Sequence, residues 1–192
     1  MTYLIIGLIL FLATHSVRIF AEEGRSQLIA ERGLLKYKIA YSIVSVIGLV
    51  LIVWGYSLAR LDPVYLWFPP MWTKHLSALL TLPAFILLVA AYVPASKIKS
   101  IVGHPMAAGV KLWALSHLIS NGTLADVLLF GSFLTWSIAA FSSARRRDRA
   151  QGISRVQGKL TNDAVAVVVG GALWFVFARH LHAMLFGIAP FG

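Results

Sequence analysis

The sequence predicts an all-α protein, a polytopic membrane helix bundle of about six transmembrane helices in a single domain, residues 1–192. Of the 192 residues, 59% are hydrophobic and only 12% are charged, whereas soluble domains use charged residues for about a quarter of their length. The mean hydropathy of +0.80 indicates more apolar surface than one buried core of this size requires, so lipid must solvate much of it. This excludes an ordinary cytosolic enzyme and a disordered chain. The lack of cysteine excludes a disulfide-stabilised secreted module.

Six apolar runs approach the roughly 20 residues that a helix needs to cross a bilayer. The fourth run is short, so it is either a slightly shortened spanning helix or one half of a re-entrant hairpin with the fifth. We expect the first run to be retained in the protein, because it lacks the basic segment and the cleavage site of a signal peptide. The runs are residues 3–20, 37–59, 72–92, 105–120, 124–141 and 163–188.

The basic residues predict the orientation of these helices. With six helices and the N-terminus outside, twelve Lys and Arg fall in inner loops and two in outer loops, and the other three of the seventeen lie inside apolar runs. Cytoplasmic loops of membrane proteins are enriched in Lys and Arg, so we expect an N-out, C-out arrangement. A five-helix arrangement is less favoured, because it would place the basic loops on opposite sides. The net charge of +10 then reflects topology and anionic lipid rather than a nucleic-acid partner.

Ionisable side chains inside the apolar runs are the first candidates for function. Each costs about 2.5–3.5 kcal/mol to insert and usually faces a bundle interior or a cavity. In the first run, His15 and Arg18 share one helical face with Glu22, which Arg18 can pair with at i+4. An imidazole beside a guanidinium favours an anionic or metallic ligand between helices. The alternative is that Arg18 reaches the headgroups while His15 hydrogen-bonds a neighbouring helix.

The fourth run supplies the other candidates, His104, Lys111 and His117. A single histidine in an apolar helix is more often a structural hydrogen-bonding group than a metal ligand. Two such histidines on different helices, His15 and His117, in a chain without cysteine or a carboxylate cluster, favour a low-spin haem with two imidazole ligands. Arg18 and Lys111 would suit the haem propionates.

The depths of the two histidines complicate this pairing. At 1.5 Å per residue, His15 is expected about 6 Å to the inner side of its helix midpoint and His117 about 7 Å to the outer side. Helix tilt or a re-entrant fourth run would reconcile the two depths. Otherwise His15 pairs with His104 on the inner side, and His117 pairs with His75 or His180 on the outer side.

Three stretches of the chain resemble the NnrU family of small bacterial membrane proteins, and the resemblance extends over nearly the whole length. They are residues 7–18 with their His-Ser-x-Arg ending, residues 103–122 (GHPMAAGVKLWALSHLISNG), and residues 129–136 with Phe-Gly-Ser-Phe. The family is named for a link to nitrite and nitric oxide metabolism in denitrifying bacteria. Its plant relatives are similar to the 15-cis-zeta-carotene isomerase, a membrane enzyme that uses haem b.

The resemblance implies a haem b site with two histidine ligands, at His15 and His117 in this sequence. It also implies a location in the bacterial inner (plasma) membrane as a multi-pass protein. A thiolate ligand proposed for the plant enzyme has no counterpart, because Ala114 stands at that position. At this position the chain departs from the plant enzyme, so the resemblance does not extend to an exchange between thiolate and histidine ligands.

The sequence therefore predicts a haem b-binding membrane protein with iron at His15 and His117, and with Arg18, His104 and Lys111 in the cofactor site. His104 would be a substitute ligand or a supporting partner. The protein would serve nitrogen-oxide metabolism or the redox-dependent cis-trans isomerisation of a lipophilic polyene. Its partners would be membrane lipid and a lipophilic small molecule or redox partner.

Two other functions stay open, and no residue is assigned a catalytic role. One is a membrane lipid-modifying transferase, because His104 and Pro105 at an inner helix boundary are loosely similar to the Arg-His-Pro element of membrane methyltransferases. Gly103 stands where those enzymes have arginine. The other is a non-enzymatic assembly factor for nitrite and nitric oxide reductases, with the histidines as hydrogen-bonding groups between helices.

Overall fold

The computed structural model describes residues 1–190, which form ten helical segments and no strand. This confirms the predicted all-helical class. Residues 191 and 192, the last two of the predicted domain, lie outside the described residues. The long helices are α1 (Thr2–Phe20), α3 (Leu34–Ala59), α4 (Met71–Ala90), α6 (Pro105–Ser120), α7 (Leu124–Ala150) and α8 (Leu160–Val176). The short segments are α2 (Glu22–Arg32), α5 (Lys97–Val102), a π-helical turn η1 (Phe177–Leu181) and α9 (His182–Phe186).

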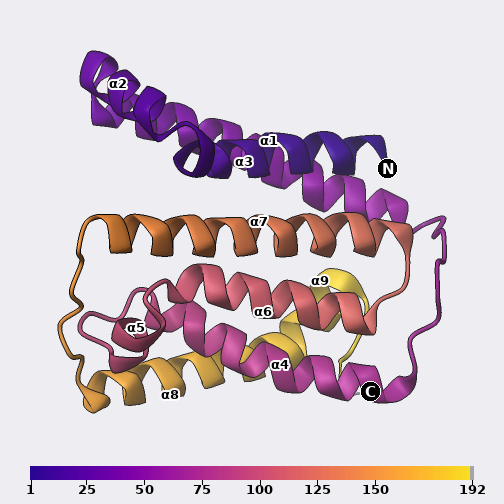
Figure 1. Ribbon diagram of the computed structural model, residues 1–192. Helices are drawn as coiled ribbons and strands as arrows, with labels where there is room; N and C mark the ends of the chain where they lie inside the picture. The colour runs from indigo at the N-terminus through magenta and orange to yellow at the C-terminus, as the bar shows by residue number, and fades with distance from the viewer. Residues whose placement is uncertain (191–192) are drawn as a thin grey trace.

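The long helices pack side by side in the order α3, α1, α7, α6, α4 and α8. Figure 1 shows the α1–α3 pair along one side of α7, with α6 and α4 along the other side. The N-terminal pair therefore contacts the rest of the bundle through α7.

Five helical stretches are long and apolar enough to cross a membrane, namely residues 2–20, 34–59, 71–90, 124–150 and 160–186. The fourth predicted run corresponds to α6, which has 16 residues and a length of about 24 Å, and it is not among these five stretches. It nevertheless runs beside α7 from one end of the bundle to the other (Figure 1). The amide of Leu66, between α3 and α4, donates to the carbonyl of Gly122, after α6, over 2.8 Å. The end of α6 thus meets the loop between α3 and α4, at the end of the bundle opposite α5, and this favours a shortened spanning helix over half of a re-entrant hairpin.

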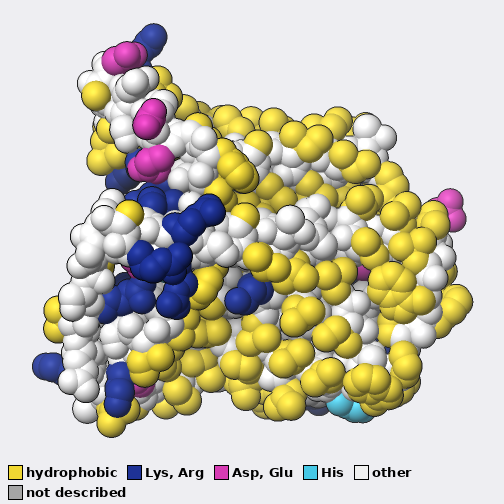
Figure 2. All heavy atoms as spheres, in the orientation of Figure 1, with side chains coloured by type: hydrophobic (Ala, Val, Ile, Leu, Met, Phe, Trp, Pro, Cys, Tyr) yellow, Lys and Arg dark blue, Asp and Glu magenta, His cyan; other side chains and the backbone are white. Residues whose placement is uncertain are grey.

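The two ends of the bundle differ in charge. Arg60, which follows α3, donates from Nη1 to the carbonyl of Phe186 in α9 over 2.6 Å, and Leu4 at the start of α1 contacts Gly55. The start of α1 and Phe186 therefore lie at the same end of the bundle, which we call the outer end after the predicted orientation. Lys and Arg side chains gather at the opposite end (Figure 2), where α5 and the 151–159 loop lie (Figure 1). We call this the inner end, and its charge agrees with the predicted orientation.

Lipid-facing side chains account for the high hydropathy. Ile43 and Val50 of α3 are 55% and 58% exposed, and Val168 of α8 is 68% exposed. The fully enclosed core is small and made mainly of leucine, alanine and phenylalanine from α1, α3 and α7. Most apolar residues therefore face the bilayer, as the composition predicted.

Glycines allow α1 and α3 to approach closely. A Cβ on Gly7 would lie 2.6 Å from the Ile52 nitrogen, and one on Gly48 would lie 2.8 Å from the Phe11 nitrogen. A Cβ on Gly55 would overlap the Leu4 backbone. Close van der Waals packing of this kind drives helices to associate in lipid, because the lipid tails are as apolar as the side chains and the hydrophobic effect does not favour association there.

The sixth predicted run, residues 163–188, is not one continuous α-helix. The segment begins earlier, at Leu160, contains the π-helical turn η1 around Arg179 and His180, and ends at Phe186. A π-helical turn adds one residue to a turn of α-helix. The apolar pattern of the sequence does not predict it, because one added residue leaves the composition of the run unchanged.

We expect Gly55→Leu to lower the stability of the α1–α3 pair, because the added side chain collides with the backbone of α1. Overpacking of this kind costs about 1–3 kcal/mol. The unfolding temperature in detergent should fall relative to Gly24→Leu, because a Cβ at Gly24 meets no atom within 4 Å. Equal unfolding temperatures would contradict the packing role of Gly55.

The absence of cysteine makes the predicted orientation easy to test. A membrane-impermeant maleimide should label Asp62→Cys, between α3 and α4, on intact cells. It should label Ser154→Cys, between α7 and α8, only after the membrane is permeabilised. The opposite pattern would place the N-terminus on the cytoplasmic side.

Candidate functional site

A cavity of about 460 Å³ lies near the inner end, with walls from α1, α6 and α7. We call it the inner cavity. Of the five predicted cofactor-site residues, His15, Arg18 and His104 line it, whereas Lys111 and His117 do not. The other lining residues are Ile19, Ala91, Lys99, Gly103, Pro105, Met106, Ala107, Trp136, Ala140, Ala144, Arg147, Asp148, Gln151 and Ile153.

His15 is fixed by its own helix and by aromatic neighbours. Its Nδ1 lies 2.7 Å from the carbonyl oxygen of Phe11, one turn earlier. A carbonyl only accepts, so Nδ1 carries the proton and Nε2 is the free acceptor. The ring stacks on Phe11 at 4.1 Å and contacts Tyr41 and Trp136 at centroid distances of 5.2 and 6.0 Å. Nε2 has no hydrogen-bond partner in the part of the chain that the structure describes.

Cationic side chains surround the inner cavity. Arg18 pairs with Glu22 at 3.5 Å, as the i+4 spacing predicted. Arg147 on α7 donates to Ser143 Oγ over 2.7 Å and to the carbonyl of Arg18 over 3.2 Å, which joins the inner ends of α1 and α7. Lys99 of α5 also lines the cavity. The wall therefore combines apolar residues with three cations.

His104 belongs to a polar cluster that we call the inner latch, formed by His104, Asp148 and Arg155. The Asp148 carboxylate accepts from Arg155 Nη2 and lies 2.9 Å from His104 Nε2. Gly103 has φ +82°, and a Cβ there would overlap the Arg155 guanidinium. The inner latch thus joins the start of α6, the end of α7 and the 151–159 loop. Because His104 Nε2 contacts the Asp148 carboxylate, this nitrogen is not free to bind a metal.

Lys111 lies apart from the inner cavity. Its Nζ is 4.8 Å from the centroid of the Phe141 ring, and the Arg145 guanidinium carbon is 5.7 Å from the same ring. Lys111 is therefore a cation–π partner of α7. Of the two residues predicted to hold propionates, only Arg18 lines the inner cavity.

His117 repeats the local geometry of His15. Its Nδ1 lies 2.9 Å from the carbonyl oxygen of Trp113 and its ring stacks on Phe130 at 4.7 Å. Nδ1 also lies 3.2 Å from the hydroxyl oxygen of Ser116. Nε2 has no hydrogen-bond partner among residues 1–190. Both predicted iron ligands are therefore oriented by a backbone carbonyl, as is usual for metal-binding histidines.

The structure does not bring His15 and His117 face to face. His15 contacts Trp136 and His117 contacts Phe130, and six residues of α7 correspond to about 9 Å along its axis. His15 lies nearer the inner end, as the sequence predicted. The two imidazoles are connected through the rings of Phe11, Phe133 and Trp113, with centroid distances of 5.7 Å between the first two and 5.6 Å between the last two. The pairing of His15 with His117 as ligands stays a prediction.

Several residues of the site were absent from the sequence-based prediction. Lys99, Arg147, Asp148 and Trp136 carry no feature in the sequence that distinguishes them from other residues of loops and apolar runs. Only the fold shows that they share a cavity with His15. Within the described residues, no group of three or more His, Asp and Glu side chains could hold a metal ion.

We expect Asp148→Asn to loosen the inner latch, because the neutral amide loses the ionic attraction to Arg155. Trypsin should then cut the 151–159 loop several-fold faster in inside-out vesicles. Asp62→Asn in an outer loop is the matched control. An unchanged cleavage rate would show that the latch does not hold this loop.

Comparison with known proteins agrees with the resemblance seen in the sequence. The family model described as NnrU protein matches residues 3–190. No curated protein and no solved structure matches the chain. The matched range includes every residue of the candidate site, and it covers almost the whole chain. The protein belongs to the NnrU family.

Proposed function

We propose that this NnrU-family membrane protein binds haem b at the inner cavity, with His15 as an iron ligand. The observation that carries the proposal is the state of the His15 imidazole at the cavity wall. Its Nδ1 is held by the Phe11 carbonyl, and its Nε2 is left without a partner within the described residues. This is the tautomer through which histidine binds haem iron.

The chemistry of the wall fits a haem. Haem b has a flat apolar body and two carboxylates. Ala140, Ala144 and Trp136 provide small and flat apolar surfaces. Arg18, Lys99 and Arg147 provide cations that suit carboxylates.

His117 does not line the inner cavity, so it is proposed as the second ligand only with a shift of α6 toward α1 that moves the rings of Phe11, Phe133 and Trp113 from between the two imidazoles. The support is its free Nε2 and its Nδ1 held by the Trp113 carbonyl, together with the family resemblance. His104 is a supporting residue, because the inner latch engages its Nε2. Lys111 is left out of the proposed propionate site, because it does not line the inner cavity.

Bound haem would supply one-electron chemistry, or binding of a small molecule at an open iron position. The residues of this chain would hold and orient it, and the surrounding aromatic rings would exclude water. The family's link to nitrogen-oxide metabolism supports a redox role in the bacterial inner membrane, and the isomerase resemblance supports action on a polyene.

The visible absorption spectrum tests this proposal. Protein purified in detergent from haem-replete cells should show a Soret band, with sharp α and β bands after dithionite reduction. A colourless protein that takes up no added haemin would refute haem binding. Labelled methyl transfer would then distinguish a transferase from an assembly factor.

Single substitutions test the ligands. We expect His15→Ala to lose most of the haem and His117→Ala to convert a six-coordinate spectrum to a five-coordinate one. His182→Ala is the matched control, because His182 lies in α9 and its Nδ1 faces the Ile188 carbonyl at 2.7 Å. An unchanged spectrum would remove the substituted histidine from the ligand set.

A further inference from the structure

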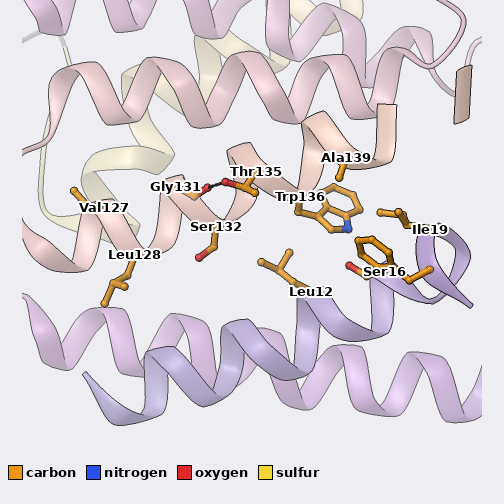
Figure 3. Close-up of a pocket in the computed structure, with 11 residues that line it drawn as sticks. Leu12, Ser16, Ile19, Val127, Leu128, Gly131, Ser132, Thr135, Trp136 and Ala139 are labelled. Carbon is orange, nitrogen blue, oxygen red and sulfur yellow. Dashed lines mark hydrogen bonds between the residues drawn. The ribbon is translucent and has the colours of Figure 1, made fainter. Parts of the chain in front are cut away.

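A second cavity, of about 480 Å³, lies between α1 and α7. We call it the α1–α7 groove. Leu12 and Ser16 of α1 face Leu128 and Ser132 of α7 across it, and Trp136 lies toward its inner end (Figure 3). Its walls come from membrane-spanning helices. Its occupant must therefore be soluble in lipid.

Unsatisfied hydrogen-bond donors distinguish this groove from an ordinary lipid-facing surface. The Trp136 indole Nε1 is buried and has no hydrogen-bond partner in the described structure. Figure 3 shows the edge of the ring that carries this nitrogen turned toward α1. A buried donor without an acceptor costs about 1–3 kcal/mol, so native proteins rarely retain one without a reason.

Two of the three hydroxyl groups of the groove also lack partners among the described residues. Thr135 Oγ1 donates back to the Gly131 carbonyl over 2.9 Å, which is the usual solution for a hydroxyl in a helix. Ser16 and Ser132 make no such bond within residues 1–190, although both line the groove. Ser16 and Ser132 therefore offer two hydroxyl donors to a ligand that carries an acceptor oxygen, and the buried Trp136 Nε1 becomes a third donor once the side chains that cover it move aside.

The depth of these donors indicates where that oxygen lies. Trp136 is nine residues before Arg145, the first residue of the basic run, or about 13 Å along the helix axis. Phosphates and glycerol esters of lipids lie in the headgroup layer, outside the hydrocarbon. An acceptor at Trp136 must belong to a molecule whose polar group enters the hydrocarbon layer.

We propose that the α1–α7 groove binds a lipid-soluble quinone. A ring carbonyl of the quinone accepts a hydrogen bond from Trp136 Nε1, and its isoprenoid chain lies along the apolar wall formed by Leu12, Val127 and Leu128. A quinone combines a flat ring and carbonyl acceptors with a fully apolar chain, which matches the donors and the depth of the groove.

The position of the groove gives the quinone a relation to the inner cavity. Ile19 and Trp136 line both spaces, so one indole ring separates the quinone from the proposed haem site. The quinone is then a redox partner within reach of the haem. Quinone binding itself does not rest on the haem proposal, and it is measured without haem.

The first experiment measures binding of decylubiquinone to the full-length detergent-purified protein by titration calorimetry. We expect saturable binding. Trp136→Phe keeps a ring but removes the donor, and should weaken binding about tenfold. Trp54→Phe is the control, because Trp54 stacks on Tyr3 outside the groove.

A steric variant tests the location without disturbing the fold. A Cβ at Gly131 meets no atom within 4 Å and Gly131 lines the groove, so Gly131→Leu should fill the groove and abolish binding. Gly171→Leu on α8 is the matched control, because a Cβ there also meets no atom within 4 Å. Equal binding by these two variants, or no binding by the unmodified protein, would overturn the proposal.

The two proposals fail separately. Haem absorbance is recorded on the same samples, and we expect His15→Ala to lose haem but to bind decylubiquinone as before. If the groove instead retains only a phospholipid that Gly131→Leu displaces, as measured by native mass spectrometry, the quinone assignment is wrong.

Discussion

The structure depends on one buried carboxylate at the outer end of α7. Asp126 is 5% exposed and accepts hydrogen bonds from the Tyr56 hydroxyl over 2.6 Å and from the Thr123 hydroxyl over 2.6 Å and amide over 3.0 Å. The bonds with Thr123 form a capping box at the start of α7. The bond with Tyr56 fixes the position of α7 along its axis relative to α3. Because α1 and α3 contact the other helices through α7, this position also decides which α7 side chains meet α1. His15 meets Trp136, and both the inner cavity and the α1–α7 groove are consequences of that register.

Much of the fold could be predicted from the sequence, because its main determinants are local. Composition and run length predict an all-helical membrane bundle, and the distribution of Lys and Arg predicts that one end of the bundle is more basic than the other. The start and end of individual helices were harder to predict. The run at residues 37–59 begins at Leu34 in the structure, and the run at 124–141 continues to Ala150, because a helix extends beyond the apolar layer wherever its polar residues still favour helix.

The candidate site was less predictable, because it is built from contacts between distant segments. The sequence identified His15, Arg18 and His104 as ionisable residues in apolar surroundings, and the fold brings these three to one cavity. The sequence could not show that Asp148 and Arg155 would engage His104, because 51 residues separate His104 from Arg155. Lys111 was assigned to the same group as a basic residue of the fourth apolar run, whereas its long side chain reaches Phe141 instead. Lys111 lies seven positions after His104, which is about two helical turns. The sequence alone therefore does not show whether the Lys111 side chain enters the inner cavity with His104 or contacts α7.

The different lengths of neighbouring helices have a consequence for the surrounding bilayer. The 26 residues of α3 extend about 39 Å and the 16 residues of α6 about 24 Å, whereas the hydrocarbon layer is about 30 Å thick. The long helix can tilt to match this thickness, but the short helix can match it only if the lipid thins beside it. A bilayer of this thickness would be compressed next to α6, and we expect lipids with shorter chains to accumulate there. The length of the acyl chains of the surrounding lipids would then influence in which regions of a membrane this protein accumulates.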